Sequence, residues 1–360
     1  MNLSLAWNPS EIAVLDKVAT HPVTQRLLRC FPHANVIPVS TQRGNPFTAS
    51  SLDEAAATKH RLFIGETASF VRELDGNLGE GLLCFPYRKL VPFSNGCPFR
   101  CAYCYLMLNY RNRQPYIKIN VNWNRMLEEL ERDLFVENKP TGYNMGEMMD
   151  SLALADATGI LRELVPYFAQ SHMGRLMLLS KSDCVDSLLG LEHANHTVVS
   201  WSLNPQPVIE RYEAGAASLE ARLKAAHRVA SEGYPIRFRI DPGILIPDWR
   251  KHYADLVDVI FNHGLQPENI TLGMLRLLPG HYAVTRKAYG IDLHDAGVLE
   301  GVHGDGKLRY PAAERVAFYQ HIIDCVRTRS PQTPVSLCRE TREVMNALRP
   351  HLSPRCNCCP

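Results

Sequence analysis

Three cysteines close together in the sequence carry the clearest chemical signal in the chain. Cys97, Cys101 and Cys104 lie in the segment SNGCPFRCAYCYL and have the spacing C-x3-C-x2-C. Because Gly96 and Pro98 favour turns, the segment is expected to form a loop that can bring three thiolates together. Three such thiolates can hold three corners of an iron–sulfur cube and leave one iron open for a substrate or cofactor. The alternative is a zinc site with a fourth ligand from elsewhere in the chain.

A second group of cysteines lies at the carboxyl end of the chain. Cys356, Cys358 and Cys359 crowd the sequence SPRCNCCP, and Cys338 precedes them. One interpretation is a second iron–sulfur cluster bound by Cys338, Cys356 and Cys358, with Cys359 the weakest ligand because adjacent cysteines rarely bind one metal. The thiols could instead supply a hydrogen atom or a redox pair to an active site. The third interpretation is a solvated tail without a chemical role.

The composition limits the class of protein. The 360 residues include 39 Lys and Arg, 37 Asp and Glu, and 11 Cys, and 46% are hydrophobic. This apolar content suits a globular fold of one large domain or two ordinary ones, and it excludes disorder as the main state. The formal charge of +2 excludes a strongly basic protein that wraps nucleic acid, although it allows a local basic patch.

The sequence predicts no attachment to a membrane. No apolar stretch approaches the roughly 18 residues of a transmembrane helix. The amino-terminal segment lacks a basic region and contains Glu11, unlike a secretory signal. We therefore expect a cytoplasmic protein, in which cysteines serve as metal ligands or reactive thiols more often than as disulfides. Four isolated cysteines are expected to be small buried residues, namely Cys30, Cys84, Cys184 and Cys325.

Apolar strand-like segments alternate with helical patterns from residue 86 onward. This alternation predicts a parallel sheet with crossover helices. Among the helices, the one that starts after Ser218 is the clearest, because its apolar residues fall on one face and Gly233 ends it. The candidate strands are residues 176–180, 198–203, 236–240 and 270–275.

Polar residues follow three of these strands. Lys181 ends the first strand, Ser202 and Asn204 end the second, and Asp241 ends the third. Because ligands of parallel α/β proteins bind beyond the carboxyl ends of the strands, we expect these side chains to share one site. For each of them taken singly, an ordinary polar loop residue is the alternative.

The first 85 residues are expected to form a small α/β layer on the main domain. A helix is predicted over residues 10–20, and short strands over residues 35–39 and 61–64. The predicted organisation has an amino-terminal extension (1–85), a main domain (86–310) and a carboxyl-terminal helix with a cysteine-rich tail (311–360).

The cysteine run, with Tyr103 before its last cysteine, resembles the cluster loop of the radical S-adenosylmethionine (SAM) enzymes. Within this superfamily the chain is similar to the spore photoproduct lyases over residues 20–310. The resemblance implies a partial (βα)6 barrel of the TIM type. The matching segments occur in the same order and are residues 101–106, 115–122, 181–189, 202–204, 212–215, 222–226 and 233–234.

The resemblance also implies two cofactors. Cys97, Cys101 and Cys104 would hold a 4Fe–4S cluster, and SAM would occupy its open iron. One electron, from a reductant such as flavodoxin or ferredoxin, would then cleave SAM into methionine and a 5′-deoxyadenosyl radical. Tyr103 and Tyr105 would shape the site or carry an electron.

Further residues of the implied SAM site lie at the strand ends. Lys181 and Ser202 would approach bound SAM with Asn204 beside them, and Gly146 and Glu147 would receive the SAM amino group. This assignment agrees with the chemistry of SAM, because a lysine ammonium suits its carboxylate and carbonyl or carboxylate oxygens suit its amino group.

The sequence departs from the family at two places. Members that repair lesions place a hydrogen-donating cysteine just after the second strand region, but residues 144–152 contain no cysteine, and Met148 stands near the expected position. A thioether has no S–H to donate, so we expect weak or absent lesion repair. The family's alanine at the end of the third strand is Asp241 here, which adds a catalytic carboxylate and indicates a different substrate.

We therefore expect a radical SAM enzyme that abstracts hydrogen from a substrate, and the family implies nucleic-acid pyrimidines as that substrate. Radical modification of a nucleobase, a peptide or a small molecule is the alternative. A non-catalytic iron–sulfur or zinc module that binds nucleic acid is a hypothesis of another class. Iron content and SAM cleavage would separate the enzyme from such a module.

Overall fold

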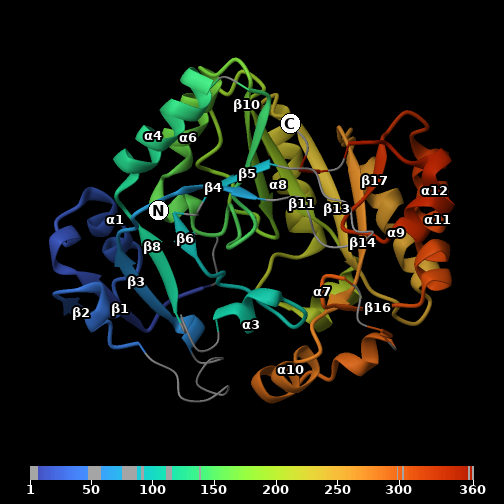
Figure 1. Cartoon of the computed structure of the whole chain (residues 1–360), viewed down its shortest axis with the longest axis horizontal. Coiled ribbons are helices and arrows are strands. Elements are labelled where there is room, and N and C mark those ends of the chain that lie inside the picture. The colour runs from blue at the N-terminus through green and yellow to red at the C-terminus, as the bar shows by residue number, and fades with distance from the viewer. Residues whose placement is uncertain are drawn as a thin grey trace.

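The computed structural model describes residues 7–47, 58–74, 87–90, 93–110, 116–137, 139–297, 299–301, 304–355 and 357–358 of the chain. Two largely parallel sheets lie next to each other, and helices cover them (Figure 1). Within these residues, no helix is both long enough and apolar enough to cross a membrane.

The larger sheet is a half-barrel. Its strand order is β17-β14-β13-β11-β10-β9-β5-β4, and every neighbouring pair is parallel except β4 with β5. The strands are β4 Val71–Leu74, β5 Tyr87–Leu90, β9 Thr141–Asn144, β10 Gly174–Ser180, β11 Thr197–Ser202, β13 Ile236–Gly243, β14 Ile270–Met274 and β17 Val335–Leu337. The expected partial barrel and its four predicted strands are confirmed.

Helices pack on the outer face of this sheet, which explains why β11 and β14 are buried along their whole length. The crossover helix α8 (Leu219–Ser231) begins where the sequence predicts. The Ser218 hydroxyl caps it by accepting the backbone N–H of Ala221 at 3.2 Å, and Gly233 follows it with a φ of +89°. The other helices are α1 Pro22–Cys30, α3 Tyr105–Tyr110, α4 Trp123–Glu131, α5 Ala155–Thr158, α6 Leu161–Ala169, α7 Gln206–Tyr212, α9 Trp249–Asn262, α10 His281–Tyr289, α11 Ala312–Arg329 and α12 Arg342–Leu348.

The smaller sheet corrects one prediction. Its order is β2 (Asn35–Val39), β1 (Glu11–Leu15), β3 (Arg61–Gly65), β8 (Ile117–Asn120) and β6 (Ser94–Asn95). The helix predicted over residues 10–20 is wrong, because this segment forms β1 and a 3₁₀ turn at Asp16–Val18. β1 lies between two parallel strands with four of its five residues buried. A short continuous apolar run of this kind cannot be distinguished from a helix by periodicity.

Each of the two sheets contains strands from both sides of residue 85. β6 and β8 lie after this position yet pair within the smaller sheet, whereas β4 lies before it and pairs with β5 of the larger sheet. At the other end, β17 lies after residue 310 and completes the larger sheet. The division of the chain at residues 85 and 310 stays a prediction. The short 3₁₀ turns are η1 Asp16–Val18, η2 Gln42–Gly44, η3 Thr58–His60, η5 Leu293–Ala296 and η6 Arg349–His351, and η4 Arg132–Glu137 is a π-helix.

Candidate active site

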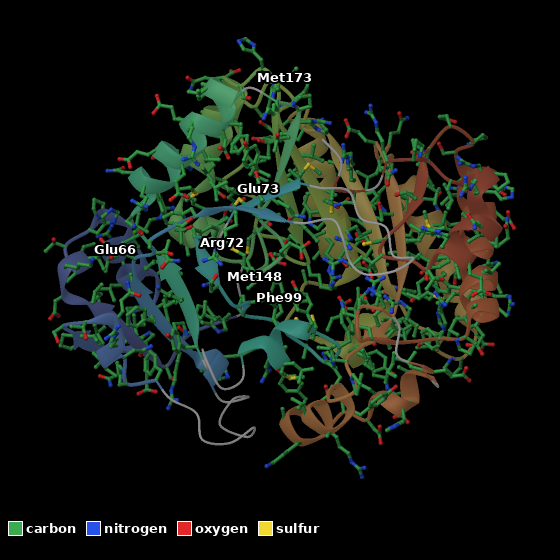
Figure 2. The ribbon with its side chains drawn as sticks, in the orientation of Figure 1. Glu66, Arg72, Glu73, Phe99, Met148 and Met173 are labelled. Atoms are coloured by element: carbon green, nitrogen blue, oxygen red, sulfur yellow. The ribbon has the colours of Figure 1, made fainter. Side chains whose placement is uncertain are left out.

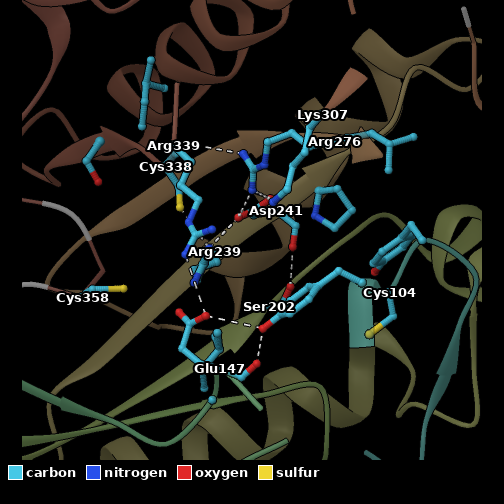
Figure 3. Close-up of a pocket in the computed structure, with 18 of the residues that line it drawn as sticks. Cys104, Glu147, Ser202, Arg239, Asp241, Arg276, Lys307, Cys338, Arg339 and Cys358 are labelled. Carbon is cyan, nitrogen blue, oxygen red and sulfur yellow. Dashed lines mark hydrogen bonds and ion pairs between the residues drawn. The ribbon is translucent and has the colours of Figure 1, made fainter. Parts of the chain in front are cut away.

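A cavity of about 790 Å³ opens at the carboxyl ends of the larger sheet. Its wall combines the cysteine loop, residues that follow β9, β10, β11, β13, β14 and β17, and the carboxyl-terminal segment (Figure 3). Parallel α/β proteins bind ligands at this edge of the sheet. The sequence-predicted site residues on the wall are Cys97, Cys101, Tyr103, Cys104, Tyr105, Gly146, Glu147, Lys181, Ser202, Asp241, Cys338 and Cys358.

The cysteine loop is held by backbone contacts at both ends. Gly96 has a φ of +95°, a left-handed conformation that favours glycine, and its N–H donates to the Met148 carbonyl at 3.0 Å. Figure 2 labels Met148 and Phe99 near this junction, between the two sheets. Farther along, β7 (Arg100–Cys101) pairs with β12 (Glu213–Ala214). These contacts fix the loop against the barrel before any metal is bound.

The three loop cysteines fit an iron–sulfur cluster. They pack in one small apolar group with Phe99 and Tyr103. Burial raises the pKa of Cys97 well above the usual range and raises that of Cys101 to about 12. Such thiols become thiolates when a metal centre supplies positive charge and displaces their protons. Within the described residues, no three His, Cys, Asp or Glu side chains converge on a single-ion site, whereas a cluster takes its thiolates at separate irons.

Lys59 lies beneath the loop and was not expected there. Its ammonium group donates to the carbonyl of Phe99, between Cys97 and Cys101. Burial opposes its charge, but Tyr289 and the loop cysteines raise its pKa overall. Lys59 belongs to η3 of the amino-terminal part, where no sequence pattern indicates a contact with a loop 40 residues away.

Lys181 joins the sheet edge to the loop. Its ammonium group donates to the Ser202 hydroxyl at 2.7 Å, lies 3.9 Å from a carboxylate oxygen of Glu213, and stands 5.7 Å from the ring centre of Tyr103. Ser202 in turn donates to the backbone carbonyl of Asp241 at 2.8 Å. The structure therefore brings together three residues that the sequence predicted separately.

Glu213 organises this region from behind the wall. Its carboxylate accepts hydrogen bonds from Tyr103 and Arg222, the latter at 2.6 Å, and all of Glu213 and Arg222 is buried. Burial opposes ionisation of Glu213, but Arg222 and Lys181 outweigh it and lower the pKa to about 2. Sequence reasoning missed this ion pair, although two charged residues at buried helix and strand positions were a signal for it.

Asn204 also lies behind the cavity wall. Its side-chain amide donates to Glu213 at 3.0 Å, and its amide oxygen accepts from the Tyr253 hydroxyl at 3.1 Å. The residue is fully buried. Its contact with SAM stays a prediction, and its observed contacts fit a positioning role through Glu213.

The segment after β9 approaches the sheet closely at Gly146. A Cβ at this position would lie 2.5 Å from the Leu179 Cβ, so only glycine fits without a shift. Glu147, the next residue, accepts the Tyr105 hydroxyl at its carbonyl and lies 4.0 Å from Arg339. Because Gly146 lies close to Leu179 of the sheet, the next residue, Glu147, lies on the cavity wall.

Asp241 is held between two arginines. Its carboxylate lies 2.5 Å from Arg239 and 2.9 Å from Arg276 (Figure 3). Burial opposes its ionisation, but the two guanidinium groups lower its pKa far below the usual range. A carboxylate with so low a proton affinity is a weak base, so these contacts favour a role in orienting the arginines over proton transfer.

Cations exceed anions on the cavity wall. In the part of the chain that the structure describes, Lys307, Arg342 and Arg349 line the cavity and form no ion pair. Burial, together with Arg276 and Arg339, lowers the pKa of Lys307 to about 8. The basic residues on the wall are Lys181, Arg239, Arg276, Lys307, Arg339, Arg342 and Arg349, against the acidic Glu147, Asp150 and Asp241.

Two of the carboxyl-terminal cysteines face the same cavity. Cys338 follows β17, and Cys358 lies in the last described segment. Cys356, the third expected ligand of a second cluster, and Cys359 lie outside the described residues. Neither Cys338 nor Cys358 forms a disulfide. The second cluster stays a prediction without support from this arrangement.

Comparisons with known proteins identify the family of this chain. A model of the spore photoproduct lyase family matches residues 87–290. The spore photoproduct lyase of Bacillus subtilis is 31% identical over 258 residues, which are 68% of this chain and 74% of that protein. The spore photoproduct lyase of Clostridium acetobutylicum is 28% identical over 247 residues, 67% of this chain and 70% of that protein.

Solved structures share the fold. A spore photoproduct lyase mutant with bound AdoMet (SAM) and dinucleoside spore photoproduct superposes with a TM-score of 0.77 at 20% identity, over 92% of this chain and 98% of that chain. The complex of spore photoproduct lyase with dinucleoside spore photoproduct gives the same values. With the family model covering more than half of the chain, this protein belongs to the spore photoproduct lyase family of radical SAM enzymes.

Proposed function

We propose that the enzyme carries out a radical reaction on a pyrimidine base of a nucleic acid bound in this cavity. The observation that carries the proposal is the composition of one wall: three cysteines of the cluster motif and an excess of cations line the same 790 Å³ space. Relatives named spore photoproduct lyase, one of them solved with a dinucleoside spore photoproduct, support the substrate class.

The first part of the proposal concerns the cofactors. Cys97, Cys101 and Cys104 would hold a 4Fe–4S cluster, since all three line the cavity and none of them forms a disulfide. When bound, the cluster supplies one electron that cleaves SAM to methionine and a 5′-deoxyadenosyl radical. A low-potential reductant such as flavodoxin or ferredoxin would deliver that electron.

The chain's own residues would orient SAM. Lys181 would pair with the SAM carboxylate, and its contacts with Ser202 and Glu213 hold it at the strand ends. The carbonyl of Gly146 and the carboxylate of Glu147 are acceptors for the SAM amino group. Tyr103 and Tyr105, both on the wall, each donate a hydrogen bond to a carboxylate or carbonyl that positions them.

The second part of the proposal concerns the substrate. Lys307, Arg342 and Arg349 lie on the cavity wall, and none of them has an acidic side chain within ion-pair distance among the described residues. Lys307 is half-buried and the two arginines are exposed, so all three can contact a ligand that brings negative charge. Phosphate groups on either side of a pyrimidine would supply that charge.

Repair and modification are the two possible outcomes for the base. Residues 144–152 contain no cysteine, and Met148, which stands near the expected donor position, is not on the described cavity wall. This observation favours modification, unless another residue returns a hydrogen atom to the substrate. The same cavity also supports the broader alternative of a free nucleobase or a small anionic molecule.

The cofactor test starts with anaerobic reconstitution. The protein should turn brown with about four irons per chain, and dithionite with SAM should yield 5′-deoxyadenosine. Replacing Cys97, Cys101 or Cys104 with Ala should abolish both, whereas Cys325→Ala on α11 is a matched control that should change neither. A colourless zinc protein that leaves SAM intact would instead identify a binding module.

The substrate test uses ultraviolet-irradiated and intact thymine-containing oligonucleotides. Mass spectrometry of the digested products should reveal recovered thymine or a new pyrimidine derivative that depends on SAM. SAM cleavage without any change in the oligonucleotides would reject the nucleic-acid substrate and leave the radical SAM assignment intact.

A further inference from the structure

Two thiols outside the cysteine loop line the cavity on the side away from Cys104 (Figure 3). Cys338 and Cys358 are 20 residues apart in the sequence, yet both lie close to the same guanidinium group, that of Arg239. These two thiols therefore line the same cavity as the three cysteines of the cluster motif.

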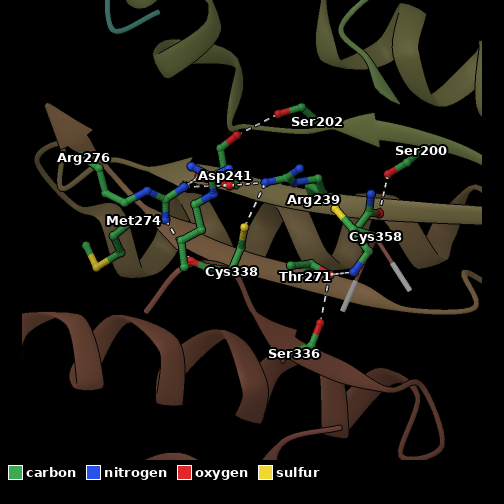
Figure 4. Close-up of polar contacts among 12 residues, drawn as sticks. Ser200, Ser202, Arg239, Asp241, Thr271, Met274, Arg276, Ser336, Cys338 and Cys358 are labelled. Atoms are coloured by element: carbon green, nitrogen blue, oxygen red, sulfur yellow. Dashed lines mark hydrogen bonds and ion pairs between the residues drawn. The ribbon is translucent and has the colours of Figure 1, made fainter. Parts of the chain in front are cut away.

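The carboxyl-terminal segment is anchored inside the barrel by Asn357. Its backbone N–H donates to the Thr271 hydroxyl at 2.8 Å, its side-chain oxygen accepts from Ser200 at 2.6 Å, and its carbonyl accepts from Arg237 at 2.9 Å. Figure 4 labels Ser200 and Thr271 near Cys358, the next residue. These partners lie on β14, β11 and β13, and Asn357 is only 2% exposed. The carboxyl-terminal segment is therefore packed into the barrel, and its hydrogen bonds give Cys358 a defined position.

A second set of contacts continues this anchoring. The Asn269 side chain donates to the Arg355 carbonyl at 3.1 Å, and the backbone N–H of Ser353 donates to the Val335 carbonyl at 2.7 Å. Polar side chains on the inner face of a sheet are costly unless they are hydrogen-bonded. Here the carboxyl-terminal segment supplies hydrogen-bond partners for these polar side chains, which indicates that the barrel interior is complementary to this segment.

Cys358 lies against the carboxyl end of β9. Its sulfur accepts from the Asn144 side-chain amide at 3.6 Å, a weak hydrogen bond, and the residue is 5% exposed. Asn144 begins the stretch 144–152 that lacks a cysteine of its own. The carboxyl-terminal segment thus brings a thiol to this stretch from more than 200 residues away in the sequence.

Cys338 keeps its proton. Its backbone N–H donates to the Leu272 carbonyl at 2.8 Å, and its sulfur accepts from Arg239 at 3.2 Å (Figure 4). Burial raises its pKa, and the nearby arginines only partly oppose this effect. A neutral thiol held by one hydrogen bond retains an S–H bond that can be given up as a hydrogen atom.

We infer that Cys338 and Cys358 are the hydrogen-atom donors of this enzyme, with Cys358 the first because it contacts Asn144 at the end of β9, where the stretch 144–152 begins. The inference rests on the proposed radical function. In the step, the S–H bond breaks homolytically, a C–H bond forms at the carbon radical, and the unpaired electron remains on sulfur. One electron from the low-potential reductant and one proton from solvent restore the thiol.

The test measures deuterium in the 5′-deoxyadenosine formed from SAM in D2O without substrate. Thiol hydrogens exchange with solvent and carbon-bound hydrogens do not, so the wild-type enzyme should produce 5′-deoxyadenosine that carries one deuterium. Cys358→Ser should lose most of this label and Cys338→Ser/Cys358→Ser all of it, because an alcohol O–H bond is too strong to yield hydrogen to a carbon radical. Serine keeps a hydrogen-bonding group of similar size, which protects the fold.

The controls separate the possible failures. Cys325→Ser, on α11 and off the cavity wall, should retain the label. Label retained in the double variant would point to a tyrosine hydroxyl and overturn the inference. Wild-type 5′-deoxyadenosine without deuterium overturns the inference alone, whereas no 5′-deoxyadenosine from the wild type overturns the proposed function as well.

Iron content gives a second readout that does not depend on turnover. The donor role predicts about four irons per chain in the wild type and in the double variant. A fall from about eight to about four in the double variant would identify the two cysteines as ligands of a second cluster and reject them as donors.

Discussion

Glu213 shows how one residue can organise a site without reaching the cavity. Its buried carboxylate contacts Tyr103, Asn204 and Arg222 and lies 3.9 Å from Lys181. Removing one partner of such a buried pair leaves an uncompensated charge. The orientation of Lys181 and Tyr103 on the wall therefore depends on an ion pair, Glu213 with Arg222, that does not itself line the cavity.

Lys307 makes ligand binding sensitive to pH. Burial and the neighbouring Arg276 and Arg339 lower the pKa of Lys307 from 10.5 to about 8. An anion favours the charged lysine, so oligonucleotide affinity should be highest below this pKa and fall as the pH rises from about 7 to about 9. The loss should be roughly tenfold, the value of one charge-assisted contact of about 1.5 kcal/mol.

Fluorescence anisotropy at constant ionic strength measures this effect. Lys307→Met should bind weakly at every pH, and Lys307→Arg should bind tightly across the range because arginine stays protonated. A pH dependence that persists unchanged in Lys307→Met would assign the titration to another group.

At the scale of elements, short pieces of structure position the cluster motif. The two-residue ladder of β7 with β12 ties the cysteine loop to the segment that carries Glu213. The 3₁₀ turn η3 brings Lys59 from the amino-terminal part to the carbonyl of Phe99. The smaller sheet thus contributes a positive charge to a site formed mainly by the barrel.

We expect Lys59→Met to lower the reduction potential of the bound cluster. Reduction adds negative charge, which the nearby ammonium group stabilises, and net charge is one of the determinants of cluster potentials. A shift of about 59 mV corresponds to a tenfold change in the one-electron equilibrium. Redox titration followed by electron paramagnetic resonance measures the potential without turnover.

Lys17→Met is the matched control for this prediction, because Lys17 is 60% exposed and pairs with Glu66 far from the loop. Lys59→Arg should restore a potential near that of the wild type. An unchanged potential in a correctly folded Lys59→Met variant would show that Lys59 serves the structure of the loop only.

At the scale of the whole molecule, positive charge is concentrated on the cavity wall. The chain carries a formal charge of only +2, but basic residues outnumber acidic ones on the described cavity wall. Attraction of a nucleic acid should therefore come from this cavity and not from the protein surface as a whole.

Salt titration of oligonucleotide binding tests this distribution. Each phosphate neutralised on a single strand adds roughly 0.7 to the slope of log affinity against log salt concentration. Arg342→Ala should reduce the slope by about one contact, whereas Arg228→Ala, on the exposed side of α8 and paired with Asp186, should leave it unchanged. Equal slopes in wild type and Arg342→Ala would remove this arginine from the binding surface.

The barrel was largely predictable because its signals are local. Residues 176–180 are a short apolar run, residues 236–240 alternate apolar residues with arginine, and the Ser218 cap and Gly233 mark the ends of one helix. The β1 strand was mistaken for a helix because its apolar run is short. The pairing of β1 with β2 and β3, which determines its conformation, involves residues far away in the sequence.

The sequence by itself determined the chemistry of the cysteine loop, since the spacing of Cys97, Cys101 and Cys104 and the turn residues around them lie within ten positions. Only the tertiary structure decided what surrounds that loop. Lys59 and Cys358 reach the site from opposite ends of the chain through hydrogen bonds to Phe99 and Asn144. Such contacts leave no period or spacing in a sequence, because the folding of the two sheets alone brings their partners together.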